Sequence, residues 1–280
     1  MGAVAIVVIA AAMVLTTRDV DPDGIQDPSP TATTERAPIA IATVPVGTTP
    51  AGVATTGTAV WVTNLNGRTV TRIDPATNQT TATIPVDEEP FRVAATSSAV
   101  WVTHLTGTVT RIDPATNETA ATLSFSGQPQ GVAATETAVW VSNGPDATIT
   151  RIDPATNETT ATINLGGSPS GVAATDTAVW VTNGNGTVSR IDPATNETTA
   201  TINAPATSVT GPAGVAATDG AVWVTNSNND TVLRIDPDTN EAAATISVGD
   251  LPMGVAATEV AVWVTNGIGR SVTRVDPGTG

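Results

Sequence analysis

Six tryptophans divide the sequence into near-identical units. They are separated by 40, 39, 40, 43 and 40 residues, and most stand in the text P-x-G-V-A-A-T-x-x-A-V-W-V-T-N. After a short loop the unit continues T-V-T-R-I-D-P-A-T-N-E-T-T-A-T-I. Self-similarity at a period of about 40 residues is typical of repeat architectures, in which every unit forms the same supersecondary structure.

Each unit contains four short segments of β character and none with helical periodicity. The turn Asp153–Asn157 reads D-P-A-T-N, with proline at the second position of a type I turn and an asparagine that tolerates a left-handed conformation. Four antiparallel strands per period are typical of a β-propeller blade. We therefore predict an all-β fold, a β-propeller of six four-stranded blades over residues 38–280. In the third unit the segments are Gly131–Thr135, Ala138–Asn143, Thr148–Asp153 and Glu158–Leu165.

The two ends of the repeat region complement each other. The last unit stops after its third segment, and Ile39–Gly47 resembles Thr81–Val86, a fourth segment. We expect Ile39–Gly47 to pair beside Thr273–Asp276 as the outer strand of the sixth blade, because this removes an open sheet edge. The alternative is a seven-bladed ring that is truncated at residue 280.

The segment before the repeats has the composition of a membrane anchor. Residues 1–17 carry no charge, Ala3–Leu15 is an unbroken apolar run, and the net acidic flank Arg18–Asp23 favours the non-cytoplasmic side. We predict a short transmembrane anchor or signal segment at 1–17 and a disordered tether at 18–37. The propeller then lies outside the membrane, at a bacterial cell surface or in the periplasm, or it is secreted. A cleaved signal with an unusual start, or a true start upstream, are the alternatives.

Charge and residue usage exclude several functions. The net charge is −15, all 11 basic residues are arginine, and the chain has no cysteine and one histidine. An acidic chain lacks the basic footprint of a nucleic-acid binder. Without cysteine there is no disulfide, thiol nucleophile or cysteine zinc site. We predict no metal site, no cofactor, no catalytic residue set and a monomer.

The repeated tryptophan and the repeated R-I-D text are interpreted as structural. Both faces of a propeller blade pack against other blades, so a tryptophan at one position of every unit predicts an anchor between blades. The period of two along a strand places the arginine and aspartate on one face, within reach of each other or of the adjacent blade.

The second unit departs from the other five. Where they read Pro-x-Gly, it reads Pro90-Phe91-Arg92, and where they carry asparagine after the tryptophan strand, it carries His104. In a propeller these two connections share one face. Two departures that meet at one place favour a ligand-binding site there.

Acidic residues adjoin this departure, and two interpretations stay open. One is a site for a small molecule or a protein on the loop face. The other is drift in one unit, or compensation in which Arg92 pairs with Glu88 or Glu89. The predicted ligand-binding residues are Glu88, Glu89, Phe91, Arg92 and His104.

The text A-V-W-V-T-N followed by V-x-R-I-D-P-x-T-N resembles the YVTN-type β-propeller repeats, with tryptophan in place of tyrosine. It is similar also to the propellers grouped with virginiamycin B lyase and to NHL-like repeats, over about residues 38–280. The lyase branch implies metal-assisted opening of a cyclic depsipeptide by more than one histidine, whereas this chain has His104 alone. Other relatives imply extracytoplasmic binding modules. We therefore expect a membrane-tethered, non-catalytic binding propeller, and the alternative is a lyase or hydrolase for a small cyclic or peptide substrate.

Overall fold

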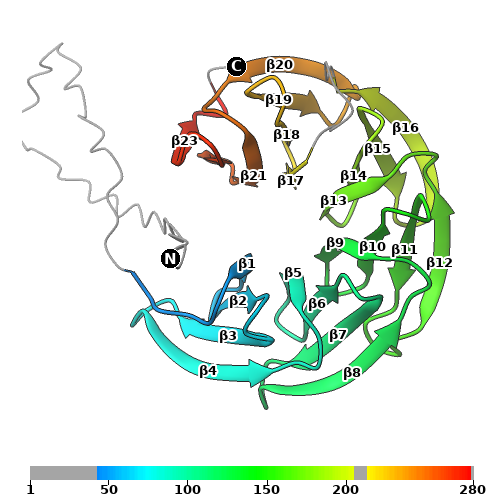
Figure 1. Cartoon of the computed structure of the whole chain (residues 1–280). Coiled ribbons are helices and arrows are strands. Elements are labelled where there is room, and N and C mark those ends of the chain that lie inside the picture. Colours follow the sequence, from blue (N-terminus) through cyan, green and yellow to red (C-terminus); the bar gives the residue numbers. More distant parts are fainter. Residues whose placement is uncertain (1–42, 205–212, 279–280) are drawn as a thin grey trace, which may run out of the picture.

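The computed structural model describes residues 43–204 and 213–278. Within these ranges the chain forms 23 strands and no helix. The strands form six antiparallel sheets arranged around one axis, as Figure 1 shows. The fold is a β-propeller, so the predicted all-β class and the six blades are confirmed. In each blade the strands follow chain order from the axis to the rim.

The strands repeat the same lengths from blade to blade. Blade 1 contains β1 (Pro50–Thr55), β2 (Val60–Asn64), β3 (Thr69–Asp74) and β4 (Gln79–Pro85). Blade 2 contains β5 (Pro90–Ala95), β6 (Val100–His104), β7 (Thr108–Asp113) and β8 (Glu118–Ser124). Blade 3 contains β9 (Pro129–Ala134), β10 (Val139–Asn143), β11 (Thr148–Ile152) and β12 (Thr159–Asn164). Blade 4 contains β13 (Pro169–Ala174), β14 (Val179–Asn183), β15 (Thr187–Asp192) and β16 (Glu197–Asn203). Blade 5 contains β17 (Val215–Ala217), β18 (Val222–Asn226), β19 (Thr231–Asp236) and β20 (Glu241–Ser247), and blade 6 contains β21 (Pro252–Ala257), β22 (Val262–Asn266) and β23 (Ser271–Val275).

Two predicted segments, 1–17 and 18–37, lie outside the described residues. The described residues include no helix that is long and apolar enough to cross a membrane.

The hydrophobic core lies between the blades. Trp61 of blade 1 packs with Ile84 of its own blade and with Val100, Val102 and Ile112 of blade 2. The equivalent tryptophans of blades 2 to 5 lie in the same kind of cluster, and all five are at most 1% exposed. The predicted anchoring role of the tryptophan is thereby confirmed for five blades.

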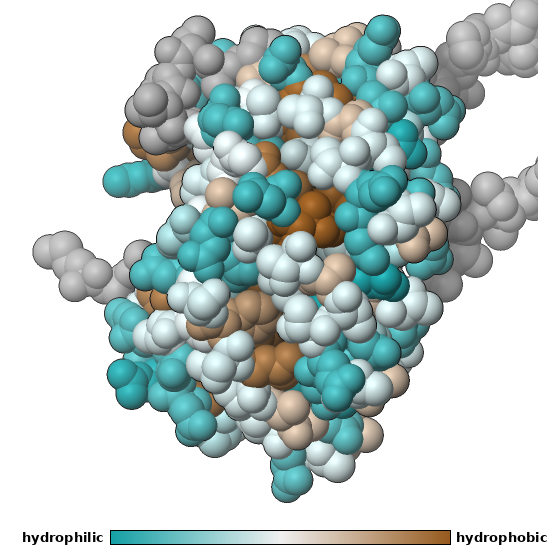
Figure 2. Space-filling view, turned by 90° about the vertical axis from the view of Figure 1, so that its right-hand side faces the viewer, coloured by the Kyte–Doolittle hydropathy of each residue, from teal (hydrophilic) through white to brown (hydrophobic). Residues whose placement is uncertain are grey.

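In blades 1 to 5 the outer strand covers this core with polar residues. In β8, for example, side chains alternate between exposed and half-buried positions. Figure 2 shows the part of the rim that carries β12 and β16: hydrophilic and neutral residues cover most of it, with hydrophobic atoms recessed between them.

In blades 1 to 4 the repeated arginine connects the blade to the following one. The guanidinium of Arg72 lies 5.2 Å from the ring centroid of Trp61. It donates hydrogen bonds to the Pro114 carbonyl at 2.9 Å and to Asn117 Oδ1 at 3.0 Å, both in the D-P-A-T-N turn of blade 2. Asp74 instead accepts from the backbone N–H of Ala76 in its own turn. The arginine therefore reaches the adjacent blade rather than its own aspartate.

In blades 1 to 5 a hydroxyl at the end of the second strand makes a further link near the axis. Thr63 Oγ1 accepts a hydrogen bond from the Gly52 N–H at 2.8 Å and donates to the Phe91 carbonyl of blade 2 at 2.9 Å. Thr225 Oγ1 makes the same link from blade 5 to the Met253 carbonyl of blade 6 at 3.1 Å. These hydroxyls fasten the inner strands of adjoining blades to each other.

The predicted closing strand is not seen in the described part of Ile39–Gly47. Residues 43–47 form no strand, and β23 pairs only with β22 among the described residues. Val44 and Val46 pack instead on the face of blade 1 that carries Val60, Val62 and Ile73. Figure 1 shows blade 1 and blade 6 as the two ends of the arrangement, with no blade between them. The described part of this segment therefore adjoins blade 1, whereas the sequence predicted pairing with blade 6.

Candidate functional site

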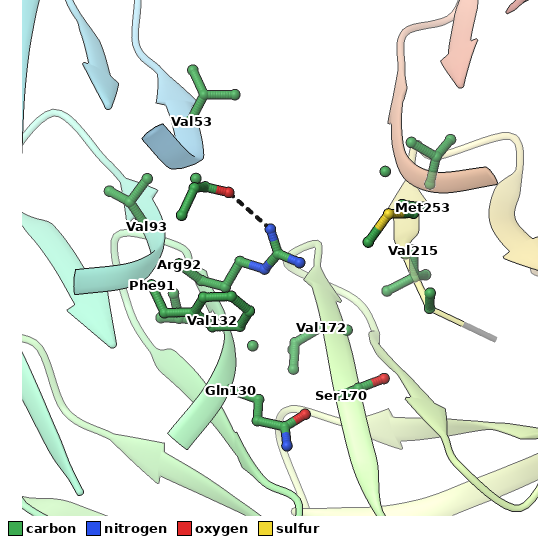
Figure 3. Close-up of a pocket in the computed structure, with 18 of the residues that line it drawn as sticks. Val53, Phe91, Arg92, Val93, Gln130, Val132, Ser170, Val172, Val215 and Met253 are labelled. Atoms are coloured by element: carbon green, nitrogen blue, oxygen red, sulfur yellow. Dashed lines mark hydrogen bonds between the residues drawn. The ribbon is translucent and has the colours of Figure 1, made fainter. Parts of the chain in front are cut away.

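A cavity of about 540 Å³ lies on the axis of the propeller, surrounded by the first strands of all six blades (Figure 3). Each blade contributes the same three positions, the last three of the text Pro-x-Gly-Val. The innermost strands are therefore both the structural hub of the ring and the wall of the cavity.

The position x differs from blade to blade although the surrounding text is nearly constant. All six x residues line the cavity, and their side chains range from methyl to phenyl, amide, hydroxyl and thioether. They are Ala51, Phe91, Gln130, Ser170, Ala213 and Met253. We had not identified Gln130, Ser170 and Met253 from the sequence, although variation at one position of a constant motif was the signal that marks them.

The glycine after x allows adjacent inner strands to approach closely. A Cβ built on Gly131 would lie 2.1 Å from the Ser170 carbonyl oxygen, and one on Gly52 would lie 2.8 Å from the Phe91 carbonyl oxygen. Both distances are far below van der Waals contact, so a side chain at this position forces the neighbouring strand to move. Five blades keep the glycine, and blade 2 has Arg92 in its place.

Arg92 extends into the cavity, as Figure 3 shows. One of its terminal N–H groups donates a hydrogen bond to the Ala51 carbonyl at 3.1 Å. Its guanidinium carbon lies 4.5 Å from the ring centroid of Phe91. Water reaches the side chain, yet the surrounding walls displace enough solvent to lower the pKa of Arg92. Among the described residues that line the cavity, Arg92 is the only charged one.

His104 lies inside blade 2 and does not line the cavity. It is 1% exposed, and its Nε2 lies 2.9 Å from Thr110 Oγ1. In blade 1 the equivalent Asn64 donates from Nδ2 to Thr71 Oγ1 at the same distance. Burial lowers the pKa of His104, and the nearby Glu88 carboxylate opposes this effect only in part. The imidazole therefore takes the place of the asparagine of the other blades and makes the buried hydrogen bond that joins β6 to β7.

Glu88 belongs to the same end of the blade. Its carboxylate accepts hydrogen bonds from the hydroxyls of Thr106 and Thr108, the latter at 2.7 Å. These bonds lower the pKa of Glu88. Glu89 is exposed. The acidic residues thus belong to the loop region rather than to the cavity wall.

The five predicted site residues therefore fall into separate surroundings. Pro90 pairs with His104, so both departures do lie at the same end of blade 2. Phe91 and Arg92 line the axial cavity, whereas Glu88 and His104 are bonded to threonines of blade 2. No ion pair joins Arg92 to Glu88 or Glu89 among the described residues. The alternative in which Arg92 pairs with Glu88 or Glu89 is therefore not seen in this structure, where Arg92 bonds to Ala51 and Glu88 to Thr108.

The described residues include no group of three or more histidine, cysteine, aspartate or glutamate side chains that are placed to hold a metal ion.

Comparisons with known proteins give similarity at the level of structure. No protein-family model matches the sequence, and no curated protein matches it. A catalytically inactive variant of virginiamycin B lyase from Staphylococcus aureus, solved with quinupristin, is 18% identical and aligns over 82% of each chain with a TM-score of 0.71. The selenomethionine form of that lyase is 17% identical over 82% of this chain and 85% of its own, with a TM-score of 0.65. The computationally designed protein Ika8 is 14% identical over 82% of this chain and 71% of its own, with a TM-score of 0.68.

At these identities the similarity concerns the fold and not the chemistry. Together with the repeat text and the six blades, it identifies the chain as a β-propeller repeat protein.

Proposed function

We propose that this protein is a non-catalytic binding module that takes up a small molecule in its axial cavity. The observation that carries the proposal is the variation at position x. Six near-identical units differ at a position that lines the cavity in every blade. The six positions occupy the same place in their blades, and an asymmetric ligand on the axis accounts for the variation among them.

The size and chemistry of the cavity support a small molecule rather than a protein partner. Ligand pockets commonly have roughly 300–1,000 Å³ and are mostly apolar with a few polar groups. Here Val53 and Met253 are 48% and 51% exposed, and Arg92, Gln130 and Ser170 supply polar groups. A recessed volume of about 540 Å³ accommodates a compact ligand and not a folded surface.

A cavity-filling substitution tests this proposal. Ala213→Trp places a large side chain at an x position, which already accommodates phenylalanine in blade 2. Thr160→Trp, on the exposed outer strand β12, is the matched control. We expect the uncharged dye N-phenyl-1-naphthylamine to bind the parent chain and the control equally, and Ala213→Trp to weaken binding by about 10-fold or more, as blocked pocket contacts of this size imply. Equal binding by all three would place the dye elsewhere and end the proposal.

We further propose that the propeller is tethered outside a bacterial membrane. The apolar run Ala3–Leu15 and its acidic flank support this location. The full chain should fractionate with membranes and be digested by protease added to intact spheroplasts, and a chain that starts at Asp19 should be soluble. Protection of the full chain from that protease would contradict the orientation.

The similarity to virginiamycin B lyase supports a second candidate, a lyase that opens a cyclic peptide substrate. His104 is the only histidine of this chain, and it is buried against Thr110 rather than aimed at the cavity. This placement favours binding without catalysis. Mass spectrometry after incubation with quinupristin decides the matter: a ring-opened product that His104→Asn abolishes would support the lyase.

A further inference from the structure

The inference that follows rests on the proposed axial binding function and specifies its ligand. We infer that the ligand is a small organic anion, with one negatively charged group bound by Arg92 and an otherwise apolar body. A carboxylate and a sulfonate share the chemistry that the geometry requires.

The position of Arg92 differs from that of the other described arginines. The chain has 11 arginines and no lysine, and six of the arginines stack over the tryptophans of the blades. Arg92 alone among the described arginines lines the axial cavity. In a chain of net charge −15, this single positive group on the axis provides a site at which a small anion is attracted rather than repelled.

The guanidinium has donors to spare. A guanidinium carries five N–H donors in a planar fork that matches a carboxylate or sulfonate. The described structure gives the Arg92 side chain one hydrogen bond, to the Ala51 carbonyl, and no carboxylate partner. The remaining N–H groups are therefore free to form charge-assisted hydrogen bonds with a bound anion.

The guanidinium is carried by a position that leaves little room for a side chain in other blades. The arginine replaces a glycine whose Cβ would crowd the next inner strand in other blades, at 2.8 Å in blade 1 and 2.7 Å in blade 4. The backbone N–H of Arg92 donates to Thr103 Oγ1 at 3.2 Å, whereas the backbone N–H of Gly52 donates to Thr63 Oγ1 at 2.8 Å. Stacking on Phe91 and the bond to Ala51 hold the side chain over the cavity. A side chain that occupies a glycine position of the repeat and projects into the cavity fits a binding role better than a structural one.

The side chains on the opposite wall of the cavity indicate the chemistry of the uncharged part of the ligand. Figure 3 shows Met253 and Val215 across the cavity from the Arg92 guanidinium. Met253 is half exposed to the cavity, and its flexible thioether adapts to ligands of different shape. A ligand that reaches from Arg92 to this wall has a charged end and an apolar end. The described lining supplies one cation, so it fits a ligand with one negative charge better than a polyanion such as a nucleotide.

Two dyes that differ by one sulfonate test the inference. The probes are 8-anilinonaphthalene-1-sulfonate, which is anionic, and N-phenyl-1-naphthylamine, which is its uncharged counterpart. They are titrated into the parent chain, Arg92→Gln, Arg92→Gly and the control Arg270→Gln, which removes an exposed charge far along the chain in blade 6. We expect Arg92→Gln and Arg92→Gly to bind the sulfonate about 10-fold more weakly or worse, as the loss of a charge-assisted hydrogen bond implies. The neutral dye should bind all four chains alike.

The outcomes separate this inference from the proposal on which it rests. If the neutral dye binds the cavity and the sulfonate binds the Arg92 variants as well as the parent, the anion inference is overturned and the axial site stands. If neither dye responds to Ala213→Trp, the axial site itself falls. Displacement of the sulfonate dye by decanoate but not by decanol extends the inference to carboxylates, and displacement by neither confines it to sulfonates.

Arg92→Gly restores the repeat text, so its thermal stability should equal or exceed that of the parent, and a loss of stability would assign Arg92 a structural role instead.

Discussion

Blade 1 and blade 6 carry the same residues on their tryptophan faces but experience different surroundings. Trp61 is 1% exposed because blade 2 covers it, whereas Trp263 is only half-buried, and Val272 on the same blade is 41% exposed. Both tryptophans nevertheless keep an arginine over the ring, at 5.2 and 5.9 Å. The stack of arginine on tryptophan is therefore a property of a single blade, and burial is a property of a pair.

The hydrogen bonds near the axis give the same contrast. Thr63 Oγ1 donates to the Phe91 carbonyl of the following blade. The hydroxyl of Thr265 in blade 6 is exposed and donates back to the Gly254 carbonyl of its own strand pair, at 3.3 Å. Each repeat unit thus carries the hydroxyl for this link and the carbonyl that can accept it, and the hydrogen bond between blades forms where a following blade is present.

The largest expected effect compares the two tryptophans directly. Removing a fully buried large aromatic side chain costs about 3–5 kcal/mol of unfolding free energy. We expect Trp61→Ala to lose this amount and Trp263→Ala to lose less than about half of it, because no blade among the described residues packs against the face of Trp263. Urea denaturation of both variants measures the difference. Equal losses would mean that the face of blade 6 is covered in solution, which would remove the contrast between the ends.

A second test makes the end of blade 1 resemble that of blade 6. Val44 and Val46 are half-buried against Val60, Val62 and Ile73. Replacing both by alanine should lower the free energy of unfolding by about 2 kcal/mol, since each change removes two methyl groups from a partly buried contact. Val272→Ala on the exposed face is the matched control, with an expected loss below about 0.5 kcal/mol. A control as costly as the double variant would refute the assignment of Val44 and Val46 as a cover.

Removal of the connecting hydroxyl should have a smaller effect. Thr225→Val removes the bond to the Met253 carbonyl and leaves the Gly214 N–H without its acceptor, for about 1–2 kcal/mol. Thr265→Val removes bonds within blade 6 at an exposed position and should cost less than half as much. Thermal melts of the pair measure the ratio, and a ratio near one would indicate that the link between blades contributes nothing.

The smallest expected effect concerns a position that is buried both in blade 2 and in blade 6. His104 and its counterpart Asn266 are 1% and 2% exposed. Burial lowers the pKa of folded His104 below the ordinary value of 6.5, so the unfolded chain binds a proton first as the pH falls. The stabilisation is therefore complete above about pH 6.5 and is lost as the pH falls from there through the folded pKa. Melting temperatures at pH 7.5 and 5.5 should differ more for the parent than for His104→Asn, and an identical difference would show that His104 does not titrate on unfolding.

The sequence predicted the blades because their signals are local. The period, the turns and the alternation within each strand depend on neighbouring residues, and the tryptophan clusters follow once blades stand side by side. The closing strand was harder to predict, because Val44 and Val46 show the pattern of an outer strand whichever sheet lies beside them. Pairing between distant segments leaves no mark in a strand whose neighbours are identical repeats.

The candidate site was predicted in part for a similar reason. Phe91 and Arg92 were identified because they break the motif at the axis. His104 also breaks the motif, but the asparagine it replaces is a buried partner of a threonine on the next strand, and the sequence interpretation treated it as part of an open loop. The x residues of the other blades were not predicted, because a position that varies in every blade has no consensus residue from which it could depart.

The separation of the two ends also affects how the protein opens. A row of blades held by nearest-neighbour contacts behaves as a one-dimensional array, in which an end unit detaches by breaking one interface and an internal unit by breaking two. Among the described residues, blade 6 has three strands and one face packed against another blade, so we expect it to detach at the lowest cost. Its amides then exchange with solvent before those of blades 2 to 4, and local opening proceeds inward from this end. Met253 belongs to this blade, so we expect detachment of blade 6 to widen the axial cavity on the side opposite Arg92. A ligand could then enter the cavity from that side while the Arg92 guanidinium keeps its position.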